Sequence, residues 1–193
     1  MSYEWYGILF LLIIVIAVII IVIFINRGNT LNIIDQLPNY KIVDPSHNTY
    51  WGLINVNPNI FSTTINYEFS ASTDLFWLPF TNVTTNADLN QWAIQTITPS
   101  SFNQLDTNTR MVKIINTGLF NANNNFGYLQ VTPAPIRFVL ANANANNATV
   151  FLYTSTGTNT FTLSLGDSHF TVNDHGYLVP TTGNPTEFKL VPV

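Results

Sequence analysis

The sequence predicts one long apolar helix followed by an all-β domain, and three observations lead to this fold class. Near the N-terminus, the 19 residues from 7 to 25 carry no polar side chain. Beyond them no long segment has the 3.6-residue period of an amphipathic helix, and short runs of alternating or apolar residues recur instead. These runs are separated by Asn, Gly, Pro, Asp and Thr, which are typical of turns between strands.

The apolar segment from Gly7 to Ile25 is long enough to cross a lipid bilayer as a helix. At a rise of 1.5 Å per residue it spans about 28 Å, which is close to the thickness of the hydrocarbon core. Its Ile and Val residues are mediocre helix formers in water, but in lipid every backbone group must be bonded internally, so a helix is favoured. The predicted anchor is marked along its length by Gly7, Leu11, Ile16, Ile21 and Ile25.

The residues that flank the apolar segment predict its orientation. Trp5 and Tyr6 precede it, where aromatic residues of the membrane interface are expected. Arg27 is the basic residue nearest to either end, so the positive-inside rule places the C-terminal side in the cytosol. The first six residues contain no Lys or Arg and no small-x-small cleavage site follows, so a retained anchor is favoured over a signal peptide.

The β domain is expected to follow a short stalk. We divide the chain into a tail over 1–6, a transmembrane helix over 7–25, a linker or stalk over 26–42 and an all-β domain over 43–193. The last part has about 150 residues, a common size for one domain. The expected strands are Tyr50–Val56, Ile60–Phe69, Leu75–Phe80, Gln91–Ile97, Met111–Ile115, Tyr128–Val131, Ile136–Leu140, Thr149–Thr154, Thr160–Leu165, His169–Val172, Tyr177–Val179 and Glu187–Val191.

The composition excludes several classes of function. Charged residues make up 8% of the 193 residues, against about 25% in typical soluble domains. The net charge is −4 and the six basic residues form no cluster, which argues against nucleic acid as a partner. The absence of Cys excludes disulfides, Cys-ligated zinc and thiol nucleophiles.

No motif for catalysis, metal binding or cofactor binding is present. The run Asp167-Ser168-His169 contains the residue types of a catalytic triad, but successive side chains of a strand point to opposite faces. His47, the other two histidines and Asp174 follow no known metal-ligand spacing, and Gly residues form no phosphate loop. We therefore predict a protein that is not an enzyme, with no catalytic residue, no metal ligand and no cofactor.

Two further features of the sequence are candidate binding signals. Sequons at Asn82 and Asn147 would accept N-linked glycans if the domain were lumenal, although a chain rich in Asn and Thr contains such triplets by chance. Aromatic residues could also line a sugar-binding face, for which core packing is the alternative explanation. Gln91-Trp92 lacks the spacing of the Q-x-W motif of ricin-like lectins. The aromatic residues concerned are Tyr50, Trp51, Trp77, Trp92, Tyr128, Tyr153 and Tyr177.

The end of the chain, HFTVNDHGYLVPTTGNPTEFKLVPV, resembles the repeat unit of β-trefoil domains such as those of fascin. A short strand ends at Val172, a turn with Gly176 follows, and two more strands complete the unit. Tyr128–Val131 followed by Phe151–Tyr153 has a similar layout. Gly52–Val56 followed by Phe76–Leu78 is a looser candidate, and the register requires an insertion around 81–120. The resemblance implies a β-trefoil, and a jelly-roll sandwich is the alternative fold.

An apolar anchor joined to an uncharged, Asn- and Thr-rich β domain resembles the small membrane-anchored virion proteins of large icosahedral DNA viruses. The resemblance lies in architecture and composition. It implies a minor capsid protein in the virion inner membrane, with the β domain on the cytosolic, capsid-facing side. The implied partners are the lipid bilayer and neighbouring capsid or membrane proteins. A membrane-anchored adhesin or glycan-binding module is the alternative, and a tethered hydrolase is a third hypothesis.

Overall fold

The computed structural model describes residues 12–22, 34, 36–56, 76–81, 87–98, 106–122, 126–132 and 139–193. The chain separates into two compact units, Met1–Leu37 and Pro38–Val193, which are described one at a time. Several residues named above therefore lie outside the described residues: Trp5, Tyr6, Gly7, Leu11, Ile25, Arg27, Asn82 and the expected strand Ile60–Phe69.

The first unit contradicts the predicted membrane anchor. Its described helix covers residues 12–22, and the side chains of Ile16 and Ile21 are 49% and 55% exposed. Among the described residues, no helix is long and apolar enough to cross a membrane. The predictions of a transmembrane helix over 7–25 and of a single-pass location in a virion inner membrane are therefore wrong.

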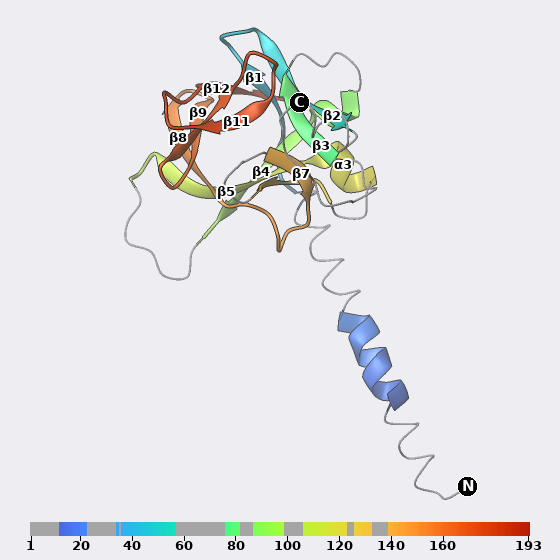
Figure 1. Ribbon diagram of the computed structural model, residues 1–193. Coiled ribbons are helices and arrows are strands. Elements are labelled where there is room, and N and C mark those ends of the chain that lie inside the picture. Colours follow the sequence, from blue (N-terminus) through green and yellow to red (C-terminus); the bar gives the residue numbers. More distant parts are fainter. Residues whose placement is uncertain are drawn as a thin grey trace, which may run out of the picture. The chain divides into compact units, whose positions relative to one another are not determined.

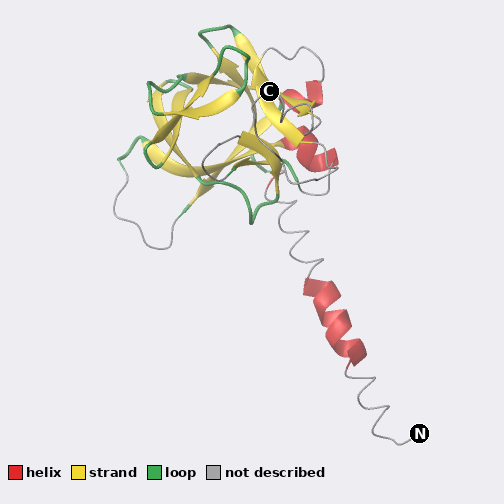
Figure 2. Cartoon of the chain, in the orientation of Figure 1, coloured by secondary structure: helices red, strands yellow, loops and turns green. Residues whose placement is uncertain are grey.

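The second unit confirms the prediction of an all-β domain, as Figure 2 shows. Its described residues include one short α-helix, α3 (Thr117–Ala122), and one 3-10 helix, η1 (Ala87–Asn90). The strands are β1 (Asn39–Asp44), β2 (Thr49–Val56), β3 (Phe76–Thr81), β4 (Trp92–Ile97), β5 (Thr109–Asn116), β6 (Tyr128–Val131), β7 (Val139–Ala143), β8 (Phe151–Gly157), β9 (Thr160–Leu165), β10 (Ser168–Val172), β11 (Leu178–Thr181) and β12 (Phe188–Pro192).

Six of the strands form a closed antiparallel ring. Around the ring the order is β1, β4, β5, β8, β9, β12 and back to β1. The first and last strands of the domain are neighbours, with Tyr40 opposite Pro192 and Ile42 opposite Leu190. Closure gives each of the six strands a partner on both sides, which removes the exposed edges of an open sheet. The ring is visible in Figure 1 as strands of widely different colour lying side by side.

The remaining strands form three hairpins, β2–β3, β6–β7 and β10–β11. Each consecutive set of four strands thus supplies two strands to the ring and one hairpin between them. Val56, Val131 and Val172, which were aligned as repeat positions, end β2, β6 and β10. The connection between β2 and β3 covers 57–75, so part of the extra length lies ahead of the predicted insertion at 81–120.

The first strand begins inside the segment predicted as a stalk. β1 starts at Asn39, and Ile42 within it is fully buried. β1 pairs with β12 and β4 as well as with β2, the next strand along the chain. The alternation over these six residues is too short to distinguish a strand from a linker, so partners from distant parts of the chain decide the conformation.

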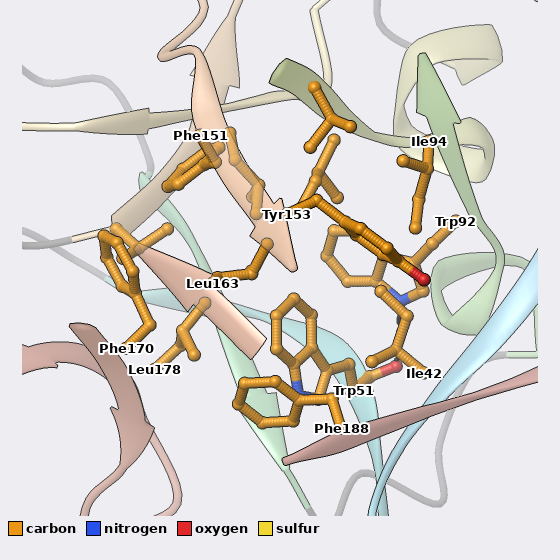
Figure 3. Packing of buried hydrophobic residues seen from close by; sticks show 14 of the residues in the cluster. Ile42, Trp51, Trp92, Ile94, Phe151, Tyr153, Leu163, Phe170, Leu178 and Phe188 are labelled. Atoms are coloured by element: carbon orange, nitrogen blue, oxygen red, sulfur yellow. Dashed lines mark hydrogen bonds between the residues drawn. The ribbon is translucent and has the colours of Figure 1, made fainter. Parts of the chain in front are cut away.

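Aromatic side chains fill the interior of the domain, and Figure 3 shows how they meet from different strands. Trp51 on β2 is 1% exposed and packs edge-on against Trp92, with ring centroids 5.7 Å apart. It packs against Phe188 in the same way at 4.8 Å. Phe188 also contacts Phe161, which stacks on Tyr153 at 4.7 Å. These contacts tie β2, β4, β8, β9 and β12 into one core.

Candidate functional site

The first candidate site is a surface depression of about 370 Å³. It lies where the β1–β2 turn, the end of β3 and the β10–β11 turn meet. The structure therefore brings His47 close to Asp174 and His175, which are far from it in the sequence. The lining residues are His47, Thr49, Phe80, Thr81, Val172, Asn173, Asp174, His175 and Gly176.

A buried carboxylate orients His47 at the rim of this depression. Asp44 is fully buried, and its Oδ2 lies 2.7 Å from Nδ1 of His47. Its Oδ1 accepts the backbone N–H of Ser46 at 3.0 Å. The His47 side chain is itself 61% exposed. With Nδ1 bonded to the carboxylate, Nε2 is the ring nitrogen that a ligand can reach.

Replacing Asp44 with alanine is expected to lower the free energy of unfolding by about 1–3 kcal/mol, because the Ser46 N–H and the His47 ring lose their acceptor. Urea titration followed by circular dichroism would measure the change. His47→Ala is the comparison, and it should cost less because its side chain is mostly exposed. Equal losses for the two variants would contradict a role for the buried carboxylate in holding the β1–β2 turn.

The β10–β11 turn is ordered by its own polar groups. Oδ1 of Asn173 accepts the backbone N–H of His175 at 3.1 Å and that of Tyr177 at 2.9 Å. Gly176 has φ +85°, and a Cβ there would lie 3.0 Å from the Phe80 ring. The Gly176 carbonyl accepts the backbone N–H of Thr81 at 2.8 Å. The turn is therefore held against the end of β3.

The histidines do not combine into a metal centre in the described part of the chain. His169 lies on β10 opposite Thr181 and does not line the depression. No group of three or more His, Cys, Asp or Glu among the described residues is placed to hold a metal ion. His47, Asp174 and His175 offer hydrogen-bonding groups instead, beside the partly exposed ring of Phe80.

A second depression, of about 280 Å³, lies where β5 begins beside β8. The guanidinium carbon of Arg110 stands 4.4 Å from the centre of the Tyr153 ring, a cation–π contact. Burial raises the pKa of Tyr153, while the charge of Arg110 and its hydrogen bond act to lower it. The lining residues are Thr107, Asn108, Thr109, Arg110, Tyr153 and Ser155.

The aromatic residues considered for a sugar-binding face are mostly core residues. Trp51, Trp92, Tyr128 and Tyr153 are between 0% and 5% exposed. Tyr50 is exposed at 46%, next to Lys41. Core packing, the alternative explanation, thus accounts for the four buried side chains, while the side chain of Trp77 lies outside what the structure describes.

The glycosylation candidate that the structure describes lies in an ordered turn. Asn147 is exposed, and its backbone N–H donates to Oδ1 of Asn144 at 3.1 Å. The same oxygen accepts the backbone N–H of Asn146 at 3.1 Å. The Asn-rich loop at 144–147 is therefore a self-capped turn.

Sequence reasoning did not identify two residues that shape these sites: Asp44, which orients His47, and Arg110, which lines the second depression. Asp44 precedes Pro45 and Ser46, and Asp followed by Pro is a common start of a β-turn, so the turn had a local signal. The burial of Asp44 had none. Arg110 had no local signal either, because its position depends on the pairing of β5 with β8.

Comparison with known proteins adds information on the fold alone. No family model matches the chain, and no curated protein matches it. A solved structure from Caenorhabditis elegans, described as a structural-genomics protein of unknown function, matches with a TM-score of 0.52 at 12% identity. The match covers 80% of this chain and 93% of that chain. The strand arrangement therefore occurs in another protein, whose description states no activity.

Proposed function

We propose that the β domain is a β-trefoil and that it acts as a non-enzymatic structural module that binds neighbouring proteins. The closed ring of six strands with three hairpins supports the trefoil assignment. Three successive sets of four strands, each used in the same way, are what a threefold repeat requires. The jelly-roll alternative has less support, because it would place the strands in two facing sheets.

The observation that carries the contact function is a set of surface turns ordered by hydrogen bonds between side chains and the backbone. Asn144 caps one turn, Asn173 caps another, and Oγ1 of Thr181 accepts the N–H of Gly183 at 3.0 Å. Turns that are already ordered lose little conformational entropy on binding. Charged residues make up only 8% of the chain, and the centres of protein interfaces are depleted in them.

The composition supports one specific version of this contact function, that of a minor capsid protein. Attachment to an inner membrane is not part of the proposal, since the described residues include no membrane-spanning helix. Cryo-EM and quantitative mass spectrometry of native particles test it. We expect a fixed ratio to one neighbouring protein that persists through salt washes. Recovery of the protein only as a free monomer would contradict the contact function.

A second candidate function is glycan binding, which the depression beside His47 favours. An aromatic ring, a carboxylate and an oriented imidazole are groups that bind sugar hydroxyls and ring faces, and Phe80, Asp174 and His47 supply them. Saturation-transfer NMR of the full-length protein with a panel of neutral methyl glycosides tests this function. Asp174→Asn should reduce the transfer, and Asp167→Asn, in an exposed turn elsewhere, should not. Absence of transfer from every glycoside would exclude the site.

A further inference from the structure

We propose that the depression beside Arg110 receives a carboxylate of the partner protein, supplied by an Asp or Glu side chain. This inference rests on the proposed contact function and names the chemistry of the partner. It goes beyond that function because it places one specific polar contact on the domain.

The guanidinium of Arg110 lies over the buried ring of Tyr153. Arg110 on β5 lies directly opposite Tyr153 on β8 in the antiparallel register. Its guanidinium carbon is 4.4 Å from the Tyr153 ring centre. Tyr153 is 5% exposed and is stacked on Phe161 in the core, with 12° between the ring planes. Since the ring cannot move away, the guanidinium is ordered before any ligand arrives, which lowers the entropy cost of binding.

Among the described residues, no carboxylate forms an ion pair with Arg110. In the part of the chain that the structure describes, the contact between an acidic and a basic side chain is the one between Asp44 and His47. The closest carboxylate in sequence, that of Asp106, accepts the hydroxyl of Thr107 at 3.4 Å. The other cation of β5, Lys113, donates instead to the carbonyl of Ala145 at 2.6 Å. Arg110 hydrogen-bonds to Tyr153, but within the described part of the chain its positive charge has no carboxylate partner, and its side chain is exposed.

The surroundings of Arg110 suit a carboxylate rather than a larger anion. A guanidinium has five N–H donors in a planar fork, which matches the two oxygens of a carboxylate. Thr107, Asn108 and Ser155 line the same depression with hydroxyl and amide groups. The depression measures about 280 Å³, enough for the end of one acidic side chain. A polyanion is disfavoured because the chain carries a net charge of −4.

The first test is a titration of the ¹⁵N-labelled full-length protein with sodium acetate, followed by NMR. Sodium chloride at equal ionic strength is the reference. We expect a saturable shift of the Arg110 Nε–Hε signal and of the Ser155 amide with acetate, and a weaker, unsaturated drift with chloride. Equal responses to the two salts would overturn the proposal.

Variants at Arg110 separate charge from geometry. Arg110→Gln should abolish the acetate response at Ser155, and Arg110→Lys, which keeps the charge but loses the planar fork, should weaken it at least about fivefold. Lys189→Gln removes an exposed cation on β12 and is the matched control, which should leave the response unchanged. An unchanged thermal midpoint confirms that each variant is folded. A Ser155 response that survives in Arg110→Gln would overturn the proposal.

Binding to the native neighbour distinguishes this inference from the contact function itself. Once the neighbour is identified by mass spectrometry, Arg110→Gln should weaken its binding about tenfold, and Lys189→Gln should not. A neighbour that binds both variants equally would leave the contact function standing and would exclude Arg110 as its centre. A protein with no neighbour in its native particles would contradict the contact function, whatever acetate does at Arg110.

Discussion

Replacing Trp51 with alanine is expected to lower the free energy of unfolding by about 3–5 kcal/mol. The indole is 1% exposed and packs edge-on against Trp92 and Phe188, so its removal leaves a cavity at the meeting point of β2, β4 and β12. Neighbouring side chains can close such a cavity only in part, because they are bound to strands of the closed ring. Since typical proteins have about 5–15 kcal/mol of total stability, this single change would remove a large share of it.

Equilibrium urea unfolding of the full-length protein, followed by circular dichroism, would measure this effect. Trp51→Phe should cost much less, since it keeps an aromatic ring and deletes an indole N–H that has no hydrogen-bond partner among the described residues. Tyr50→Ala, at the adjacent exposed position, should cost less than about 1 kcal/mol. Similar losses for Trp51→Ala and Tyr50→Ala would show that Trp51 is not part of the core.

Gly127→Ala is expected to be about as damaging, with a loss of about 3–5 kcal/mol or failure to fold. Gly127 has φ +146°, and a Cβ there would lie 2.8 Å from the Asn116 carbonyl oxygen and 2.9 Å from the Phe120 nitrogen. Both contacts are with backbone, which cannot turn aside as a side chain can. Backbone strain of about 1–3 kcal/mol and overpacking of about 1–3 kcal/mol act together. The Gly127 carbonyl accepts the backbone N–H of Asn116 at 2.9 Å, and the Gly127 N–H donates to the Ala143 carbonyl at 3.2 Å, so its backbone is held in place.

Two other glycines provide a graded comparison. Gly166 has φ +57° but open space around its Cβ position, so Gly166→Ala should show the backbone cost alone, about 1–2 kcal/mol. Gly183 meets only the Thr181 hydroxyl at 3.4 Å, and Gly183→Ala should be within about 1 kcal/mol of the unaltered protein. Thermal and urea unfolding should rank the variants in this order. A loss of stability for Gly127→Ala as small as that for Gly183→Ala would show that the backbone of Asn116 and Phe120 does not lie so close to Gly127.

Most strands of the domain could be predicted because their signals are local. The predicted bounds of Tyr128–Val131 and Thr160–Leu165 coincide with those of β6 and β9. In these segments the alternation of side chains and the flanking turn residues indicate the same strand bounds. Helix α3 was missed because six residues are too few to display a helical period. Its N-terminal signal was Asn116, whose Oδ1 accepts the N–H of Leu119 at 2.9 Å.

The candidate sites could be predicted only in part. His47, Asp174 and His175 were noted as residue types that bind ligands, but no spacing connected them, and the packing of the β1–β2 turn against the β10–β11 turn brings them together. The core position of Trp51 and Trp92 was one of two explanations, and burial distinguishes between them. Arg110 could not be recognised as a site residue from the sequence, because its contact with Tyr153 depends on the pairing of β5 with β8.

Local features of the sequence were sufficient to establish a charge-poor, Cys-free chain whose C-terminal part is built of short strands. Composition, alternation and turn residues act over a few positions, so they can be interpreted without the fold. The closure of the ring, the pairing of β1 with β12, the burial of Asp44 and the stacking of Arg110 on Tyr153 required the folded chain. Each of these features depends on contacts between residues that are distant in sequence or on burial produced by the whole domain, and no local pattern records such contacts.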